Sequence, residues 1–251
     1  MNRQALVIAS VGVSMPEALD GITAVEEALS AAAEGYVCVR AFTSPAIRRI
    51  LRDRGEDVPG LDEALEALAA QGVERVAVQP ALLLYGYEYD RLKAGAEALS
   101  GRFASLTVGR PLLADGGSIR RLALGLSQDH PAKDGAVTLF MGHGTGQGAH
   151  AVYPAVQDAW DGAGRDDLLV GVVEGRPDLD DILRRLEPGG PRNIELLPLM
   201  LAAGIHARRD MAGDWRTRLE RAGHTVTCSF TGLGRRAWVR EMYRERLEEL
   251  L

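Results

Sequence analysis

The sequence has little cysteine. Of its 251 residues only two are cysteines, Cys38 and Cys228, and no CxxC pair occurs. Both lie in apolar, strand-like runs, so we expect buried free thiols rather than a disulfide or a thiolate metal site. No HExxH motif is present either, which argues against a tight structural zinc centre.

Long apolar runs and an excess of basic residues are also lacking. No run of 18 apolar residues occurs, and the N-terminus has no apolar core of a secretion signal. We therefore expect a cytoplasmic protein that does not enter a membrane. Lys and Arg number 29 against 35 Asp and Glu, a formal net charge of −6 at pH 7. This balance argues against nucleic acid or an anionic membrane as the main partner.

What is present is an ordinary globular composition, with 46% hydrophobic and 25% charged residues. Short apolar runs alternate with amphipathic stretches, which is typical of βαβ units and of a parallel sheet covered on both faces. Strands are expected at 5–9, 36–40, 75–79, 106–108, 136–141, 168–173, 194–197 and 225–230. Helices are expected at 21–33, 61–71, 89–103, 150–163 and 178–186.

The two halves of the chain share a pattern. Aligned without gaps, residues 80–95 and 198–213 have Pro, Leu, Gly, Arg, Ala and Gly in common. The sequence therefore predicts an internal duplication into two similar Rossmann-like α/β domains, 1–128 and 129–251. Ligands of such sheets bind at the carboxyl ends of the strands, so an active-site cleft is expected between the domains.

The C-terminal segment 235–251 has apolar residues at roughly helical spacing. We expect it to form a helix that packs back on the N-terminal half.

Among the five histidines, His143 is the first candidate for chemistry. It follows an expected strand and is flanked by glycines, which let the backbone turn sharply and leave the imidazole open to a ligand. A phosphate-cradling turn is the alternative, although the tract has neither the GxGxxG spacing nor a Walker lysine. His130 and His224 lie in polar turns, and we expect both on the surface.

Glu174 and His206 follow the next expected strands of the same half. Each could be an ordinary structural residue by itself, but the spacings of 31 and 32 residues place all three candidates at successive strand ends. A parallel sheet brings such positions to one edge. Two imidazoles and a carboxylate suit a divalent first-row metal, and a His–Glu pair could equally act as a general base.

With these residues, the sequence resembles the class II tetrapyrrole chelatases, and specifically the single-chain anaerobic sirohydrochlorin cobaltochelatases. The matching motifs run along most of the chain. They are Ala41-Phe42-Thr43-Ser44, Val78-Gln79, Gly86, Glu88-Tyr89, Phe140-Met141-Gly142-His143-Gly144, Val173-Glu174-Gly175, Leu197-Pro198-Leu199-Met200-Leu201, Gly204, His206-Ala207, Asp210-Met211-Ala212 and Gly232-Leu233-Gly234.

The resemblance implies ATP-independent insertion of Co²⁺ into sirohydrochlorin in cobalamin biosynthesis, a lyase-class chelation. The metal is a substrate, with Fe²⁺ and Ni²⁺ as other candidates, and no organic cofactor is needed. The family's catalytic and metal-binding residues fall on His143, Glu174 and His206. His143 is expected to be the principal base and a ligand, Glu174 a ligand and the partner that fixes the imidazole protonation, and His206 the second imidazole ligand.

The carboxylates of sirohydrochlorin, the expected partner, need donors. Candidates for binding the macrocycle are Ser10, Gly12, Ser14, Glu88, Arg176, Arg208 and Arg209. The oligomeric state is left open, a homo-oligomer included.

The sequence departs from the family pattern near the expected ligand, at Val13, Leu82, Tyr87 and Ile205. Two alternatives therefore remain: a sirohydrochlorin ferrochelatase serving sirohaem, and a non-catalytic carrier of tetrapyrrole or metal.

Overall fold

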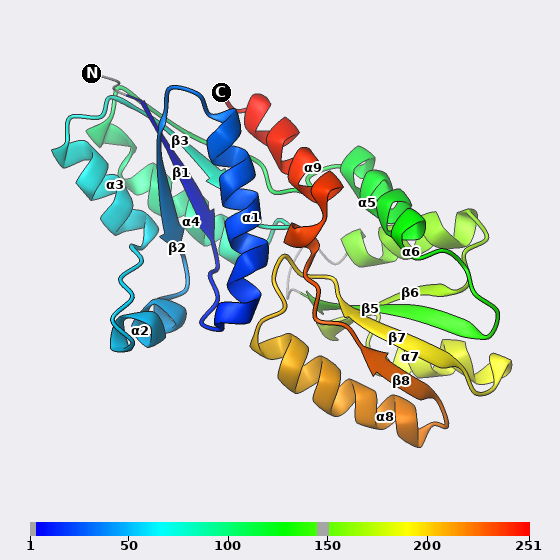
Figure 1. Ribbon diagram of the computed structural model, residues 1–251. Coiled ribbons are helices and arrows are strands. Elements are labelled where there is room, and N and C mark those ends of the chain that lie inside the picture. The colour runs from blue at the N-terminus through cyan, green and yellow to red at the C-terminus, as the bar shows by residue number, and fades with distance from the viewer. Residues whose placement is uncertain (1–3, 145–150) are drawn as a thin grey trace. The chain divides into compact units, whose positions relative to one another are not determined.

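The computed structural model describes residues 4–144 and 151–251, and it divides into two compact units (Figure 1). The first unit comprises the chain up to Ala114 together with Gly234–Leu251, and the second comprises Asp115–Leu233. Each unit contains one four-stranded parallel sheet with helices, so the predicted α/β class with two similar domains is confirmed. None of the helices in the described residues is long and apolar enough to span a membrane.

The sheet of the first unit has the strand order β2-β1-β3-β4. Residues alternate between its faces, and the side chains of Ala5, Val7 and Val78 belong to an apolar core with helices α3 and α4. The strands are β1 (Gln4–Ser10), β2 (Val37–Phe42), β3 (Arg75–Pro80) and β4 (Ser105–Val108). The helices are α1 (Pro16–Ala32), α2 (Pro45–Asp53), α3 (Leu61–Ala70), α4 (Tyr87–Ala98), the 3₁₀ helix η1 (Ser100–Arg102) and α9 (Ala237–Glu248).

The second unit repeats this arrangement with the order β6-β5-β7-β8. In both sheets the first strand of the unit lies inside, between the second and the third. The strands are β5 (Ala136–Gly144), β6 (Leu168–Glu174), β7 (Asn193–Pro198) and β8 (Thr225–Cys228). The helices are α5 (Gly116–Asp129), α6 (Val152–Gly162), α7 (Leu179–Leu186), the 3₁₀ helix η3 (Glu187–Gly189), the π-helix η4 (Ala207–Trp215) and α8 (Arg216–Arg221), and the short η5 (Leu233–Arg235) follows.

Strand β5 shows how the second sheet is covered. Its side chains at Leu139 and Met141 point to a core formed with α7, η4 and α8. Phe140, which lies between them, points to the other face, where its ring packs against that of Trp160 in α6 with the ring centroids 5.5 Å apart. The Trp160 indole donates to the carbonyl of Ala123 in α5 at 2.9 Å. Both faces of this strand are therefore fixed by packing, which sets the direction of every side chain along it.

The C-terminal helix α9 packs on α1 within the first unit (Figure 1). Tyr243 is fully buried, and its hydroxyl donates to the carbonyl of Leu82 at 3.0 Å. The contact just before α9 is so close that a β-carbon at Gly234 would lie 2.1 Å from the carbonyl oxygen of Gly21. Helix α5 groups with the second unit, so the units divide before this helix, whereas the sequence places the domain boundary after residue 128.

Two histidines expected on the surface are buried or nearly so, which corrects that expectation. His224 is 8% exposed and accepts a hydrogen bond from the backbone N–H of Arg192 at 3.2 Å. The side chain of His130 is 13% exposed, and its ring stands edge-on to Phe140 at 5.4 Å. His150, where the sequence predicts a helix to begin, lies outside the described residues.

Candidate functional site

The three predicted chemical residues lie at the carboxyl ends of neighbouring strands in the second unit. His143 is the penultimate residue of β5, and Glu174 is the last residue of β6. His206 follows β7 and is the N-cap of the π-helix η4. The parallel pairing of β6, β5 and β7 brings these strand ends to one edge of the sheet.

The imidazoles of His143 and His206 meet directly. Their ring centroids are 4.4 Å apart and the rings are perpendicular. Nδ1 of His143 lies 3.2 Å from the carbonyl oxygen of Gly144, and Nδ1 of His206 lies 2.6 Å from Oδ2 of Asp210. A carbonyl or carboxylate oxygen only accepts, so these partners assign the proton of each neutral ring to Nδ1. The lone pair of each Nε2 is then available to a metal or a proton.

Glu174 does not join this pair. It is paired in register with Gly144, whereas the neighbouring Val173 packs with the core that includes Met141, on the His143 face of the sheet. Strand alternation therefore directs the exposed Glu174 away from that face. Within residues 4–144 and 151–251, no three His, Cys, Asp or Glu side chains are gathered closely enough to hold one metal ion.

The glycines beside His143 are required by close packing. Gly144 has a φ of +87°, and a β-carbon there would lie 1.8 Å from the carbonyl oxygen of Glu174. A β-carbon at Gly142 would lie 2.3 Å from the ring of Tyr153, whose hydroxyl accepts from the N–H of Gly144 at 3.3 Å. Burial raises the pKa of Tyr153, so the phenol keeps its proton. The rest of the glycine tract, from Thr145, lies outside the described residues.

Asp210 is a site residue that the sequence reasoning did not assign. Its side chain is 15% exposed, and besides His206 it accepts a 2.9 Å hydrogen bond from Nε of Arg209. Burial acts to raise the pKa of this carboxyl, but the hydrogen bonds and charges of Arg209 and His206 outweigh it, and the pKa lies below its ordinary value. The spacing of four residues between His206 and Asp210, about one helical turn, is the sequence feature that could have indicated this contact.

The arginines predicted to bind the macrocycle have different surroundings. Arg176 is exposed and forms an ion pair with Asp181 at 2.6 Å. Arg208 is exposed, and its guanidinium lies 5.6 Å from the ring centroid of Phe230, which is itself 45% exposed. Arg208, two residues after His206, thus presents a charge beside the accessible ring of Phe230.

The candidates in the first unit lie at the carboxyl end of β1, in the loop that follows it, and at the start of α4. Ser10 is buried, whereas Gly12 has a φ of +88° and packs against Phe42. The carbonyl of Ser14 accepts from Arg54. Glu88 accepts from the hydroxyl of Thr43 at 3.1 Å, so its carboxylate is held at the end of β2.

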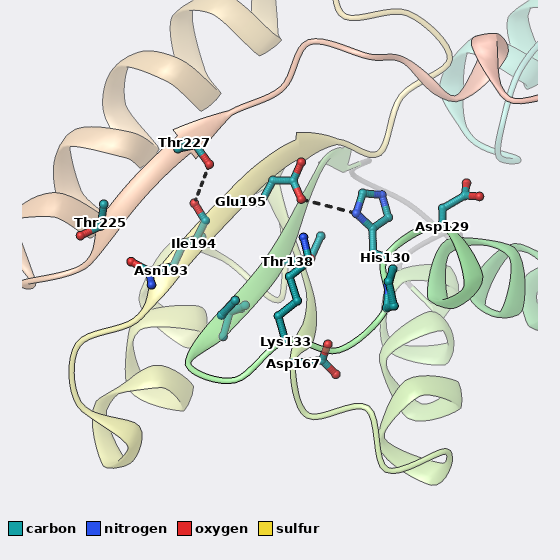
Figure 2. Close-up of a pocket in the computed structure, with 13 residues that line it drawn as sticks. Asp129, His130, Lys133, Thr138, Asp167, Asn193, Ile194, Glu195, Thr225 and Thr227 are labelled. Carbon is teal, nitrogen blue, oxygen red and sulfur yellow. Dashed lines mark hydrogen bonds and ion pairs between the residues drawn. The ribbon is translucent and has the colours of Figure 1, made fainter.

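A hollow in the second unit lies away from these strand ends (Figure 2). It is lined at the beginnings of β5, β7 and β8, and His130 points toward Glu195 across it, with Nδ1 3.5 Å from Oε2. Its lining mixes both signs of charge, since it includes Lys133 as well as Asp129 and Asp167. None of the predicted site residues lines this hollow.

Comparison with known sequences gives matches over the whole chain. The profile of the family described as cobalt chelatase (CbiK) matches residues 4–251. The sirohydrochlorin cobaltochelatase of Salmonella typhimurium is 36% identical over 256 residues, covering 99% of this chain and 97% of the relative. The sirohydrochlorin cobaltochelatase CbiKC of Nitratidesulfovibrio vulgaris is 32% identical, covering 89% of this chain and 82% of the relative.

Solved structures match the fold. SirB from Bacillus subtilis with Fe³⁺ aligns with a TM-score of 0.71 at 16% identity, covering 98% of this chain and 94% of that chain. CbiX, described as the terminal enzyme for siroheme biosynthesis in denitrifying bacteria, aligns with a TM-score of 0.54 at 17% identity, covering 98% and 99%. At these identities the likeness concerns the fold.

Proposed function

The chain belongs to the cobalt chelatase (CbiK) family, and from this membership we propose that it inserts Co²⁺ into sirohydrochlorin without ATP. Two relatives that carry this activity in their names are matched over most of their length. The observation that carries the proposal is the pair of perpendicular imidazoles of His143 and His206, both with Nδ1 engaged and Nε2 available.

Insertion requires a ligand for the ion and an acceptor for protons. Two pyrrole N–H protons leave the macrocycle as one Co²⁺ enters, so charge is balanced without a redox step or a nucleotide. His143 and His206 each offer one Nε2 lone pair, which can first bind the ion and then, once the ion has passed to the macrocycle, accept one of the two protons; His143 is the principal base. His206 supplies the second imidazole. Nitrogen ligands without a thiolate hold the ion weakly enough to release it into the macrocycle.

Glu174 is proposed as the third ligand. Its strand position directs it away from the His143 face, but it is exposed and ends its strand at the same sheet edge, so its carboxylate would have to turn around this edge to reach the ion. A carboxylate added to two imidazoles suits Co²⁺ and Fe²⁺ alike. The ligand set therefore does not choose between these metals.

The carboxylates of the macrocycle need cationic or N–H donors. We propose Arg208 beside Phe230 as one such donor, since the ring can contact the macrocycle while the guanidinium pairs with a carboxylate. Arg176 would have to exchange its pairing with Asp181. In the first unit, the backbone of Ser10, Gly12 and Ser14 remains a proposed contact, and so does Glu88, whose ionised carboxylate can accept but not donate a hydrogen bond.

We also propose that the protein works in the cytoplasm. Its cysteines, Cys38 and Cys228, are both free thiols, as in proteins of a reducing compartment.

The test is a spectrophotometric insertion assay with sirohydrochlorin and Co²⁺, Fe²⁺ or Ni²⁺. Turnover that is fastest with Co²⁺ supports the proposal, and a preference for Fe²⁺ would identify a ferrochelatase instead. Tight binding of the metallated product without turnover would identify a carrier, the alternative that the altered residues Val13 and Ile205 raise.

A further inference from the structure

We propose that Asp210 is a positioning residue that holds His206 in its Nδ1–H tautomer and so presents Nε2 to the metal ion. Arg209 supports Asp210 in this role. The inference rests on the proposed function of His206 as a ligand, and it adds a residue pair that fixes the chemical state of that ligand.

The first argument is geometric. Each oxygen of Asp210 has its own partner: Oδ2 lies 2.6 Å from Nδ1 of His206, and Oδ1 accepts from Nε of Arg209 at 2.9 Å. An arginine can only donate, and the doubly held carboxylate can only accept while it is ionised. The imidazole must therefore contribute the Nδ1–H.

The second argument is the environment of the carboxylate. The side chain of Asp210 is 15% exposed, whereas Arg209 is 72% exposed and extends into solvent. A carboxylate withdrawn from water is destabilised unless hydrogen-bonded partners compensate. Those partners are His206, which the carboxylate orients, and Arg209, the residue before Asp210.

The third argument is the element itself. Asp210 lies in the π-helix η4, of which His206 is the N-cap. The buried side chains of Ala207, Met211 and Trp215 anchor this helix to the core of the second unit. Because the helix is anchored, the separation of His206 and Asp210 is set by packing, and the hydrogen bond then fixes the ring orientation toward His143. Carboxylates that orient a ligating histidine in this way typically contribute about 10–100-fold in metal affinity or activity.

The discriminating variant is Asp210→Asn. The amide has a single oxygen, and Arg209 can only donate to it, so the amide NH₂ then faces Nδ1 of His206. This Nδ1 must accept, which moves the proton to Nε2, the atom that would bind the metal. Asp210→Ala removes the acceptor altogether and serves as the second variant. Asp214→Asn, an exposed aspartate on the same helix, is the matched control.

Two quantities are measured on the full-length chain, with folding checked by circular dichroism. The ¹⁵N shifts of the His206 ring report its tautomer, and calorimetric titration with Co²⁺ alone reports affinity. We expect Nδ1–H in the wild type and in Asp214→Asn. In Asp210→Asn we expect Nε2–H and a Co²⁺ affinity lower by at least about tenfold, with a similar loss of affinity in Asp210→Ala.

An unchanged tautomer in Asp210→Asn would overturn the proposal, even if affinity fell, because Asp210 would then act through its charge or as a direct ligand. A changed tautomer with unchanged Co²⁺ affinity would also overturn it. Neither result bears on chelatase activity. Failure of the wild type to insert Co²⁺ into sirohydrochlorin would overturn the proposed function and leave the tautomer result standing.

Discussion

Gly144 and Glu174 are paired across β5 and β6 so closely that a β-carbon on the glycine would lie 1.8 Å from the glutamate carbonyl oxygen. This contact ties the strand end that carries His143 to the strand end that carries Glu174. The relative position of the two main chains is therefore set by packing, and only side-chain rotation remains for binding a ligand.

Replacing His143 by alanine should abolish insertion of Co²⁺ into sirohydrochlorin. We expect a loss of at least about 100-fold in kcat, the usual contribution of a positioned base. The melting temperature should stay nearly unchanged, because this half-buried ring lies at a strand end outside the core. A spectrophotometric insertion assay and a thermal melt check both expectations. Turnover close to that of the wild type would rule out His143 as the base.

Replacing Gly144 by alanine should destabilise the second unit. The residue has a φ of +87° and no room for a β-carbon, so strain and overpacking together should reduce the free energy of unfolding by roughly 2–5 kcal/mol. The matched control is Gly162→Ala at the end of α6, where nothing lies within 4 Å of an added β-carbon. The control should melt at the wild-type temperature or slightly above it, because alanine favours a helix more than glycine does. Equal stability of the two variants in urea unfolding would contradict the packing argument.

Replacing Tyr243 by alanine should destabilise the first unit by about 3–5 kcal/mol, the usual effect of removing a buried aromatic ring. The ring is fully buried, and the variant also leaves the carbonyl of Leu82 without its hydroxyl donor. Tyr87, which is 71% exposed, provides the control, and Tyr87→Ala should change stability by less than about 0.5 kcal/mol. Calorimetry of both variants measures the difference. Similar melting of the two would show that α9 contributes little to this unit.

Stability of the second unit should fall as the pH is lowered through the range of histidine titration. Burial, and next the charge of Arg192, lower the pKa of His224, whose Nδ1 accepts from the Arg192 backbone. The unfolded state then binds the proton more readily than the folded state. The contribution of His224 to stability is therefore fully present when the pH is above the pKa of the unfolded state, about 6.5. It declines as the pH falls toward the lower pKa of the folded state.

Thermal melts between pH 8 and pH 5 measure this decline, and His224→Gln, which lacks the titrating ring, serves as the comparison. A slope that persists unchanged in His224→Gln would assign the effect to another group.

The sequence predicted the strands well because they are continuous apolar runs, and β6 and β7 lie within a residue or two of their expected ranges. It did not predict α2 or α5. Helix α2 carries three arginines in nine residues and buries only Leu51; its apolar residues do have helical spacing, but they are few and the helix is short. Helix α5 begins with two glycines, which disfavour a helix in isolation, but Asp115 caps it through the N–H of Ser118.

At the site, the sequence indicated which residues gather at one edge but not which side chains meet. The separation of Glu174 from His143 depends on register, and the register of β5 and β6 is set by packing on both faces. The burial of His130 and His224 likewise depends on residues distant in the chain, such as Phe140 and Arg192. The residues of a polar turn do not indicate which distant residues will pack against it.

The first unit is closed by the last helix of the chain, whereas the second unit is one continuous stretch, Asp115–Leu233. During synthesis the ribosome therefore completes the second unit before it releases α9. Chains generally fold by domains as they emerge, so the second unit can reach its final structure while the first still exposes the surface of α1 that α9 covers. The first unit, rather than the second, should accordingly depend more on chaperones and be more sensitive to synthesis that stops before α9.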